Sequence, residues 1–360
     1  MATNTELSTT IIGNMNDIVK FKLPNGKAVQ RVAATMAERD DFTRLVPAYE
    51  ANNGLTHHAL RQVSLPTGYL VDIGGSWKAS KAEFEPIVET MCTIKSTYQA
   101  PSDIFKNCSK EVGMQKLRAH KASHIMALSQ GIGNMILSGP TIPDQSAIVG
   151  LKQRAPYLTY DNKFCFSAGG TGDDLRSAWL IKPGIDTVHA LYNPFHATLG
   201  IESVDKGEQL VSGLGTSSDE HRWDLFHEFM IQKGFHIEDQ RACKRICNVA
   251  CGVSDDPGTD LVNTIVDASI LNSPTGGSLM EYDSGGKVIN ELPSPWILFC
   301  DERLYSKLVR TQNDKLFVFS SAENIYRTKL PMIGSDIIIA RWDALERTLA
   351  DGEDALEEAS

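Results

Sequence analysis

The residues with the clearest chemical potential in this sequence are histidines and an acidic residue whose spacing could surround a metal ion. His227, Glu228 and His236 would supply two imidazoles and a carboxylate, which are ligand types that hold zinc in enzymes. The spacing differs from the His-Glu-x-x-His pattern of zinc proteases, because Ile231 stands where the second histidine is required. One hypothesis is therefore a metal-dependent enzyme that uses His227, Glu228 and His236. The other is a strand whose histidines have no catalytic role.

A second histidine pair also has a spacing that can ligate a metal. His120 and His124 lie four residues apart, and therefore on one face of a predicted helix. Lys121, however, stands where the helix of a zinc protease has its glutamate. A solvated or interfacial histidine pair is the favoured interpretation.

The chain has seven cysteines, and residues 1–26 contain no apolar segment of the length that a signal peptide needs. We therefore expect reduced thiols, as in a cytoplasm. Cys243, Cys247 and Cys251 follow one another at intervals of four, whereas a zinc site favours closer Cys-x-x-Cys pairs. We expect no bound metal here.

The glycine-rich stretch Gly169-Gly170-Thr171-Gly172 could cradle a phosphate. It lacks the Gly-Lys-Ser/Thr ending of a P-loop and the spacing of a dinucleotide-binding fingerprint, which favours a tight turn. A G-x-S-x-G nucleophile elbow and paired zinc knuckles are also missing. We expect neither a cofactor nor an enzymatic activity.

The composition is that of a globular protein with a negative surface. The 360 residues are 42% hydrophobic and 22% charged, with a formal net charge of -10. This apolar content is enough for a packed core of one large domain or of two to three smaller ones. The negative charge argues against binding nucleic acid through a basic face. No apolar run approaches the roughly 20 residues of a membrane span, so we expect no membrane partner.

A long amphipathic helix is the most strongly predicted element. Between residues 111 and 139, apolar residues recur three or four positions apart, and Gly139-Pro140 is a helix stop signal. The residues that we expect to form the core face of this helix are Met114, Leu117, Ile125, Leu128 and Ile132. Such a helix would be roughly 40 Å long, which is longer than a typical globular helix.

Residues 56–86 have the pattern of an extended hairpin. Residues 56–63 and 69–80 are predicted as two extended arms around the turn signal Pro66-Thr67-Gly68, with few large apolar residues. A loop this long with little apolar content is either mobile at the surface or ordered by another molecule.

The remaining segments alternate between strands and helices, as in an α+β fold. Helices are predicted at 28–40, 259–271 and 302–310, the last capped by Asp301. Residues 42–49 fit a short helix or an irregular strand. Strands are predicted at 87–98, within 221–251, and at 296–300, 316–320 and 336–341. Pro183-Gly184 predicts a hairpin of 177–181 and 187–192, residues 272–287 are a predicted loop, and the tail from Glu346 is acidic.

Short motifs accompany these elements in a characteristic order. They are Asn52-Asn53-Gly54-Leu55-Thr56-His57, Leu65-Pro66-Thr67, Gly74 with Lys78-Ala79-Ser80-Lys81, Gly169-Gly170-Thr171-Gly172, Thr187-Val188-His189, Gly234 with Asp239 and Arg241, and Arg245-Ile246 with Asn248. Together with the order of arm, short helix, two-stranded loop, long strand and long helix, they resemble the major capsid proteins of tailed bacteriophages. The resemblance is to the Hong Kong 97-type fold and its epsilon15-like coat protein subfamily, over residues 29–341.

The resemblance implies an α+β capsid fold with five parts. Residues 1–55 would be an N-terminal arm and residues 56–86 an extended E-loop. Residues 87–168 would be the P-domain, a long spine helix (111–139) on a long β-sheet. Residues 169–335 would be mainly the A-domain with some P-domain strands, and residues 336–360 a C-terminal strand and acidic tail.

The function implied is that of a structural protein. Copies would assemble through pentamers and hexamers into the icosahedral head that encloses the double-stranded DNA of a tailed bacteriophage. The implied partners are other copies of the chain, a portal, and scaffolding or cement (decoration) proteins, with packaged DNA touched only non-specifically. The implied location is the capsid of the virion, after assembly in the host cytoplasm.

The E-loop would lie across an adjacent subunit. The residues that we expect to make this inter-subunit contact are His57, Arg61, Leu65, Pro66, Tyr69, Trp77, Lys78 and Lys81. Some relatives join subunits by an isopeptide bond between Lys and Asn. No acceptor asparagine or assisting glutamate is identifiable here, so we predict no such cross-link at Lys78 or Lys81.

Overall fold

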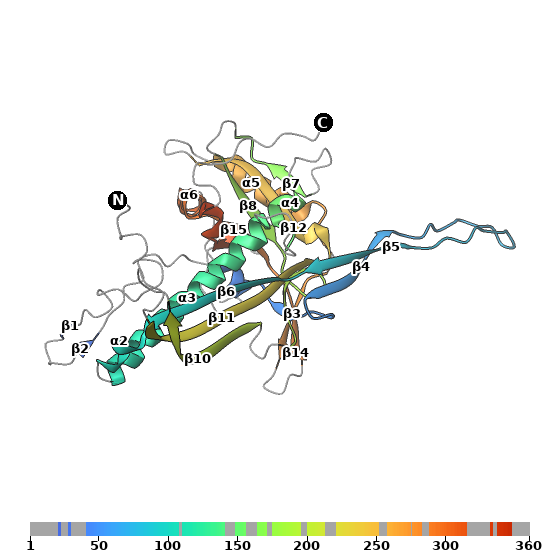
Figure 1. Cartoon of the computed structure of the whole chain (residues 1–360). Helices are drawn as coiled ribbons and strands as arrows, with labels where there is room; N and C mark the ends of the chain where they lie inside the picture. The colour runs from blue at the N-terminus through green and yellow to red at the C-terminus, as the bar shows by residue number, and fades with distance from the viewer. Residues whose placement is uncertain are drawn as a thin grey trace, which may run out of the picture. The chain divides into compact units, whose positions relative to one another are not determined.

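The computed structural model describes most of the chain as two compact units, whose elements are labelled in Figure 1. Unit 1 comprises Met1–Glu38, Thr93–Ile132 and His196–Gln232, and unit 2 comprises Arg39–Cys92, Gly133–Phe195 and Lys233–Ser360. The described residues are 21–22, 28–29, 41–107, 110–140, 148–155, 164–170, 175–195, 200–212, 221–251, 258–274, 276–282, 288–314, 332–333 and 337–347. No helix among them is long and apolar enough to span a membrane.

Unit 1 combines antiparallel strands with the first part of the longest helix. Its elements are β1 (Phe21–Lys22), β2 (Ala28–Val29), most of β6 (Cys92–Pro101), α2 (Ser102–Lys106), β10 (Ile201–Ser212) and most of β11 (His221–Ile237). β10 pairs antiparallel with β11 from Ile201↔Ile231 to Ser212↔His221, and β6 also pairs with β11.

The end strand β10 is interrupted by a bulge. The register with β11 shifts between Asp205 and Gly207. Gly207 has a φ of +72°, and its N–H donates to Asp205 Oδ1 at 2.9 Å. A glycine adopts this left-handed conformation without the clash that a Cβ would cause.

The predicted long helix is confirmed as α3 (Lys110–Ser138). Gly139 follows with a φ of +76°, and its N–H donates to Met135 O at 2.9 Å, so the predicted stop signal acts as a left-handed cap. Of the residues expected on the core face, Leu128 and Ile132 are buried and Leu117 is half-buried. Met114 and Ile125 are instead 47% and 44% exposed, which corrects that part of the expectation.

The reason lies in which face of α3 packs on the strands. His124 Nδ1 lies 2.6 Å from Ser96 Oγ of β6, and its ring stacks on Phe229 of β11. His120 stacks on Tyr98 with the ring centroids 4.9 Å apart. Because neighbouring helical positions differ by about 100° in direction, a face centred on His120, His124 and Leu128 turns Ile125 outward.

Unit 2 contains most of the other elements. Its helices are α1 (Asp41–Leu45), α4 (Leu151–Arg154), α5 (Gly258–Ile270), α6 (Glu302–Asp314) and α7 (Ala344–Arg347), with a 3-10 turn at Gln240–Ala242. Its smaller strands are β3 (Ala48–Glu50), β4 (Thr56–Ser64), β5 (Glu83–Thr90), β9 (Val188–Tyr192), β13 (Ser278–Tyr282) and β14 (Val288–Pro293).

An apolar core of unit 2 covers a six-stranded sheet. The strand order is β16 (Met332–Ile333), β17 (Ile337–Arg341), β15 (Trp296–Cys300), β8 (Leu175–Ile181), β12 (Cys243–Ala250) and β7 (Cys165–Ser167). Helices α5 and α6 contribute Leu261, Ile265, Leu304 and Leu308 to the same apolar cluster as the strand residues. The predicted strand at 296–300 and the predicted helices at 259–271 and 302–310 are confirmed.

Two polar contacts fix these helices on the sheet. Asp301 caps α6 as predicted, because its Oδ1 accepts the N–H of Leu304 at 2.9 Å. The buried Lys244 Nζ of β12 donates to the carbonyl oxygens of Ala268 and Leu271 at the end of α5. Burial lowers the pKa of Lys244 to about 8.

Several sequence expectations are corrected by the topology. β8 and β9 do not form the predicted hairpin, because β8 lies in the six-stranded sheet and β9 pairs with β3 and with the end of β11. The predicted loop 272–287 contains β13, and residues 42–49 form both α1 and β3. Except for Ala28–Val29, the helix predicted at 28–40 lies outside the described residues, as do the strand at 316–320 and the tail beyond residue 347.

An aromatic stack joins α1 to the sheet. The rings of Phe42 and Trp342 stack with centroids 4.3 Å apart, and Phe299 and Phe235 lie 5.1 and 5.9 Å from Phe42. All four side chains are buried.

We predict that Phe42→Ala lowers the free energy of unfolding by about 3–5 kcal/mol, because it leaves a cavity among three aromatic rings. Denaturant unfolding of the purified unassembled chain measures the change. Phe195→Ala is the matched control: Phe195 is 83% exposed, so its removal should change stability by no more than about 0.5 kcal/mol. Equal losses in both variants would contradict the assignment of Phe42 to the core.

Candidate functional site

The β4–β5 hairpin extends away from the other labelled elements of unit 2, and its connecting residues 65–81 are exposed (Figure 1). Its strands pair antiparallel from Thr56↔Thr90 to Ser64↔Glu83, with a register shift between Gln62 and Ser64. The predicted first arm is confirmed as β4, whereas the second arm begins at Glu83 and not at Tyr69. The single strand predicted at 87–98 is correspondingly divided into β5 and β6 at Met91.

The two faces of the hairpin differ in chemistry. Residues opposite one another in an antiparallel pair share a face. The first face, which we call the exposed face, carries His58, Leu60, Gln62, Phe84, Pro86 and Val88. The second, which we call the anchoring face, carries His57, Ala59, Arg61, Glu85, Ile87 and Glu89.

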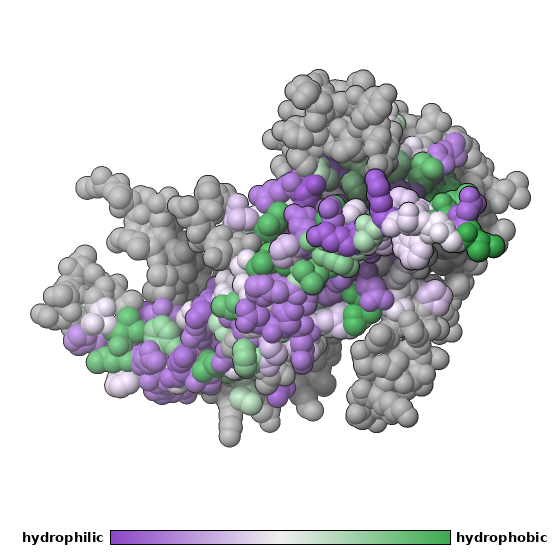
Figure 2. All heavy atoms as spheres, turned by 90° about the vertical axis from the view of Figure 1, so that its right-hand side faces the viewer, coloured by the Kyte–Doolittle hydropathy of each residue, from purple (hydrophilic) through white to green (hydrophobic). Residues whose placement is uncertain are grey.

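The exposed face presents apolar side chains to solvent. Leu60, Phe84 and Val88 are 66%, 59% and 54% exposed. The connecting residues 65–81 are all exposed, and among them are the large apolar side chains Leu65, Tyr69, Leu70, Val71, Ile73 and Trp77. Residues 65–81 therefore carry more large apolar side chains than the sequence analysis expected of this loop. Figure 2, a view of the side on which the hairpin lies in Figure 1, shows green apolar spheres scattered among purple polar ones.

The anchoring face attaches the hairpin to its own chain. Arg61 Nη2 donates to the carbonyl oxygen of Ile237 at 3.0 Å, and the ring of His57 lies 4.9 Å from that of His236. Both residues were expected to contact a neighbouring subunit, and within the chain they also help to hold the hairpin on β11. The other expected contact residues, which are Leu65, Pro66, Tyr69, Trp77, Lys78 and Lys81, are exposed.

A buried ion pair is the strongest polar contact of the anchoring face. Arg154 of α4 donates from Nη1 to Glu89 Oε1 at 2.9 Å and from Nη2 to Oε2 at 2.6 Å. Burial alone would raise the pKa of Glu89, but its interaction with His236 and the hydrogen bonds from Arg154 lower it below its usual value. Glu89 is therefore an ionised carboxylate with a two-point partner, a geometry that fixes orientation as well as distance.

Three imidazoles form a cluster that meets this pair at His236. His57, His189 and His236, which we call the imidazole cluster, come from β4, β9 and β11. His236 Nδ1 lies 3.9 Å from Glu89 Oε1, and His236 Nε2 lies 3.3 Å from Glu238 Oε2. Burial and repulsion from His236 lower the pKa of His189 to about 4. The three rings contact one another as aromatic groups, and His236 also faces the carboxylates of Glu89 and Glu238.

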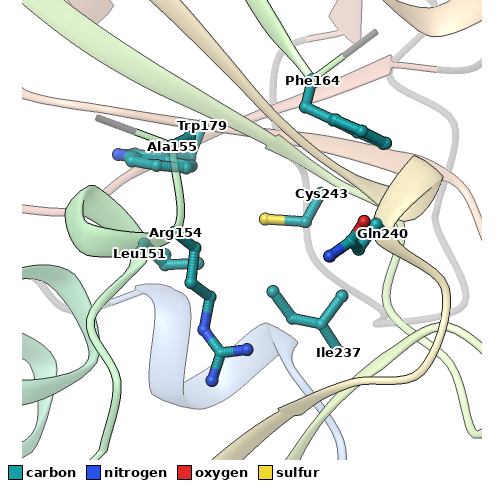
Figure 3. Close-up of a pocket in the computed structure, with 8 residues that line it drawn as sticks. All are labelled: Leu151, Arg154, Ala155, Phe164, Trp179, Ile237, Gln240 and Cys243. Atoms are coloured by element: carbon teal, nitrogen blue, oxygen red, sulfur yellow. The ribbon is translucent and has the colours of Figure 1, made fainter. Parts of the chain in front are cut away.

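A small cavity of about 180 Å³ lies beside the anchor (Figure 3). It is lined by Leu151, Arg154, Ala155, Phe164, Trp179, Ile237, Gln240 and Cys243. Arg154 is the charged residue of this lining, and its guanidinium is already paired with Glu89. The cavity therefore lies beside the Glu89–Arg154 pair, and the groups that line it are not arranged for catalysis.

The residues of the metal-enzyme hypothesis have other partners. His227 Nε2 lies 2.7 Å from Ser203 Oγ, and Glu228 forms ion pairs of 3.3 Å with Lys95 and Lys206. His236 belongs to the imidazole cluster. The described part of the chain contains no group of three or more His, Cys, Asp or Glu side chains that could hold a metal ion.

The cysteines that the structure describes are buried within unit 2. Cys92, Cys165, Cys243, Cys247, Cys251 and Cys300 form no disulfide with one another. Cys165 Sγ and Cys247 Sγ lie 3.6 Å apart, and burial raises the pKa of Cys243 to about 12. Because the thiolate is the reactive form, these cysteines have a structural role.

Three comparisons with known proteins bear on function. A family model described as major capsid protein GP7 matches residues 24–348. No curated protein sequence matches the chain. A chain from the cryo-EM structure of bacteriophage Epsilon15 matches with a TM-score of 0.64 at 15% identity, over 98% of this chain and 99% of that chain. A chain of the bacteriophage JBD30 capsid matches with a TM-score of 0.46 at 10% identity, over 87% and 93%.

The Epsilon15 match extends over nearly the whole of both chains. It confirms the α+β, Hong Kong 97-type fold expected from the sequence. None of the matches supports the metal-dependent enzyme.

We predict that Arg154→Met loosens the hairpin, because it leaves Glu89 as a buried charge without its bidentate partner, at a cost of about 3–5 kcal/mol. Hydrogen exchange of residues 56–61 and 85–90, which we call the hairpin root, should accelerate. The double variant Glu89→Leu/Arg154→Met, which removes both charges, should recover part of the protection.

Lys106→Met is the matched control for this prediction. It removes an ion pair of 3.2 Å with Glu208 in which both side chains are about half exposed, so it should cost less than about 1 kcal/mol and leave the hairpin root unchanged. Unchanged exchange of the root in Arg154→Met would show that the pair does not hold the hairpin.

Proposed function

The chain belongs to the major capsid protein GP7 family, and from this premise we propose that its β4–β5 hairpin joins each subunit to a neighbouring copy in the shell. Membership of this family makes the protein a structural component of a phage capsid and not an enzyme.

The observation that carries the proposal is the asymmetry between the two hairpin faces. The anchoring face is occupied by contacts within the chain, from Arg61 to Ile237 and from Glu89 to Arg154. The exposed face leaves Leu60, Phe84 and Val88 more than half exposed. Apolar surface of this extent, held out on an ordered element, is typical of a surface that another molecule covers.

The hairpin loop extends the same surface. We propose that Leu65, Pro66, Tyr69 and Trp77 pack on the adjacent subunit, with Lys78 and Lys81 at the rim of the contact. Apolar side chains gain free energy when covered, roughly 1.5–3 kcal/mol for each large one. Each contact is modest, but symmetry repeats it in every subunit, so a closed shell forms cooperatively.

We also propose the domain organisation that the resemblance implies. In it, residues 1–55 form an arm, 56–86 the E-loop, 87–168 the P-domain, 169–335 mainly the A-domain, and 336–360 a C-terminal strand and tail. Support comes from unit 1, which brings together β6 and the first part of α3. The six-stranded sheet supports the A-domain, since β8, β12, β15 and β16 lie within residues 169–335, while β7 and β17 come from the segments before and after it.

The assembly and its partners follow from the same proposal. Copies would form pentamers and hexamers of an icosahedral head around double-stranded DNA, assembled in the host cytoplasm with a portal and with scaffolding or cement proteins. The net charge of -10 supports only non-specific contact with DNA, since tight binding of phosphates needs clustered Lys and Arg.

We predict that the subunits of assembled particles are not covalently joined. Particles boiled in detergent should then migrate on a denaturing gel as single chains, in wild type and in the variant Lys78→Arg/Lys81→Arg alike. A ladder of multiples that disappears in the variant would contradict the prediction and identify these lysines as the linked residues.

We predict that the double variant Leu60→Ser/Phe84→Ser assembles poorly, because it removes two apolar side chains from each copy of the contact. The concentration needed for shell formation should rise by about tenfold or more, as expected for a loss of at least about 1.4 kcal/mol per contact. Size-exclusion chromatography and negative-stain microscopy measure this concentration.

Gln62→Ser is the matched control, since Gln62 lies on the same face opposite Phe84 and is already polar. The melting temperature of the unassembled chain should be nearly the same in all three proteins, because the side chains removed are exposed. Shells of the double variant that form at the wild-type concentration would refute the proposed contact.

A further inference from the structure

Two pairs of opposed residues meet at the hairpin root. In the hairpin, His57 of β4 lies opposite Glu89 of β5, and in the sheet that it contacts, His236 of β11 lies opposite His189 of β9. The ring centroid of His236 lies 4.9 Å from that of His57 and 5.2 Å from that of His189. The ring centroids of His57 and His189 lie 6.2 Å apart. Imidazoles this close repel one another when more than one is charged.

Charged and polar groups face the cluster from every neighbouring element. Glu238 Oε2 lies 3.3 Å from His236 Nε2, and the Tyr49 ring of β3 meets His189 edge-on at 5.1 Å. The other charged groups include His58 and Arg61 of β4, Glu85 and Glu89 of β5, Arg154 of α4, and Asp239 with its partner Arg241 after β11. Because Glu89 and Asp239 are already paired with arginines, the nearby carboxylates cannot balance three positive imidazoles.

The structure shows His57 and His189 in settings that favour the neutral form. The backbone N–H of Asn52 donates to His57 Nδ1 at 3.4 Å, so this nitrogen carries a lone pair. His189 is buried, and its Nδ1 has no hydrogen-bond partner among the described residues. Burial and repulsion from His236 lower the pKa of both rings, that of His189 to about 4.

We propose that the imidazole cluster and the Glu89–Arg154 pair together form an acid-sensitive joint, which holds the hairpin root on β9 and β11 at neutral pH and releases it when His57 and His189 are protonated. The joint lies within one chain, so it operates whether or not the hairpin contacts a second copy. Acid would therefore change the direction of the hairpin without unfolding the six-stranded sheet.

The direction of the effect follows from the lowered pKa values of His57 and His189. The unfolded chain binds these protons near 6.5 and the folded chain only at lower pH. The joint is therefore most stable above 6.5 and weakens as the pH falls toward about 4. Because the pKa of Glu89 is lowered as well, its carboxylate stays ionised through most of this interval, so the imidazoles respond first.

The test is hydrogen exchange of the full-length unassembled chain at about pH 7 and about pH 5, expressed as protection factors to remove the intrinsic pH dependence. A full pKa shift of His189 to about 4 predicts a loss of protection of about tenfold or more at residues 56–61 and 85–90. Residues 296–300 of the sheet core should keep their protection. Equal loss in both regions, or no loss at the root, would overturn the proposal.

Variants separate the imidazoles from the carboxylates. In His189→Gln, and independently in His57→Gln, the loss of protection at the hairpin root should shrink severalfold, because a proton acceptor has been replaced by an amide. His58→Gln is the matched control on the opposite face of β4 and should behave like wild type. A wild-type response in both His189→Gln and His57→Gln would show that the imidazoles are not the acid-sensitive groups.

Discussion

The ion pair between Glu89 and Arg154 is the contact on which the hairpin depends. A two-stranded hairpin is only marginally stable in water by itself, and the outward side chains of this one cannot stabilise it within a single chain. The bidentate geometry fixes where β5 leaves the body of unit 2, and the contacts of Arg61 and His57 fix β4 beside it. The polar groups of the anchoring face are paired within the chain. The exposed face is therefore the one that another molecule can cover.

Sequence patterns predicted the elements whose signals are local. The helix from Lys110 to Ser138 follows from an apolar period and from the Gly139-Pro140 stop, and Asp301 is recognisable as a cap because its partner, Leu304, is three residues away. The prediction that residues 177–181 and 187–192 pair as a hairpin was wrong, because strand pairing is not a local property. A turn signal such as Pro183-Gly184 shows that the chain reverses, but it does not specify whether the two strands join one sheet or two.

The candidate site was only partly predictable. Its exposed residues stand in one stretch of sequence. The Glu89–Arg154 pair and the imidazole cluster instead join residues far apart in the sequence, which only tertiary folding brings together. The contacts of His57 and Arg61 within the chain were not predicted, because alternation along β4 shows that two faces exist but not which of them faces inward. Likewise, helical spacing revealed the pair His120 and His124, yet only the contacts with Tyr98 and Ser96 show that these rings pack the helix on β6.

The bulge in β10 has a consequence for a protein that must reach high concentration before it is used. A terminal strand offers unpaired backbone groups along one side, and a long flat one invites uncontrolled lateral stacking of molecules into fibres. In β10 the left-handed Gly207 bends the strand, and the neighbouring Lys206 places a cation there that is half exposed and paired with Glu228. The bulge and the paired cation therefore disfavour the addition of a strand from a second molecule to this edge of β10.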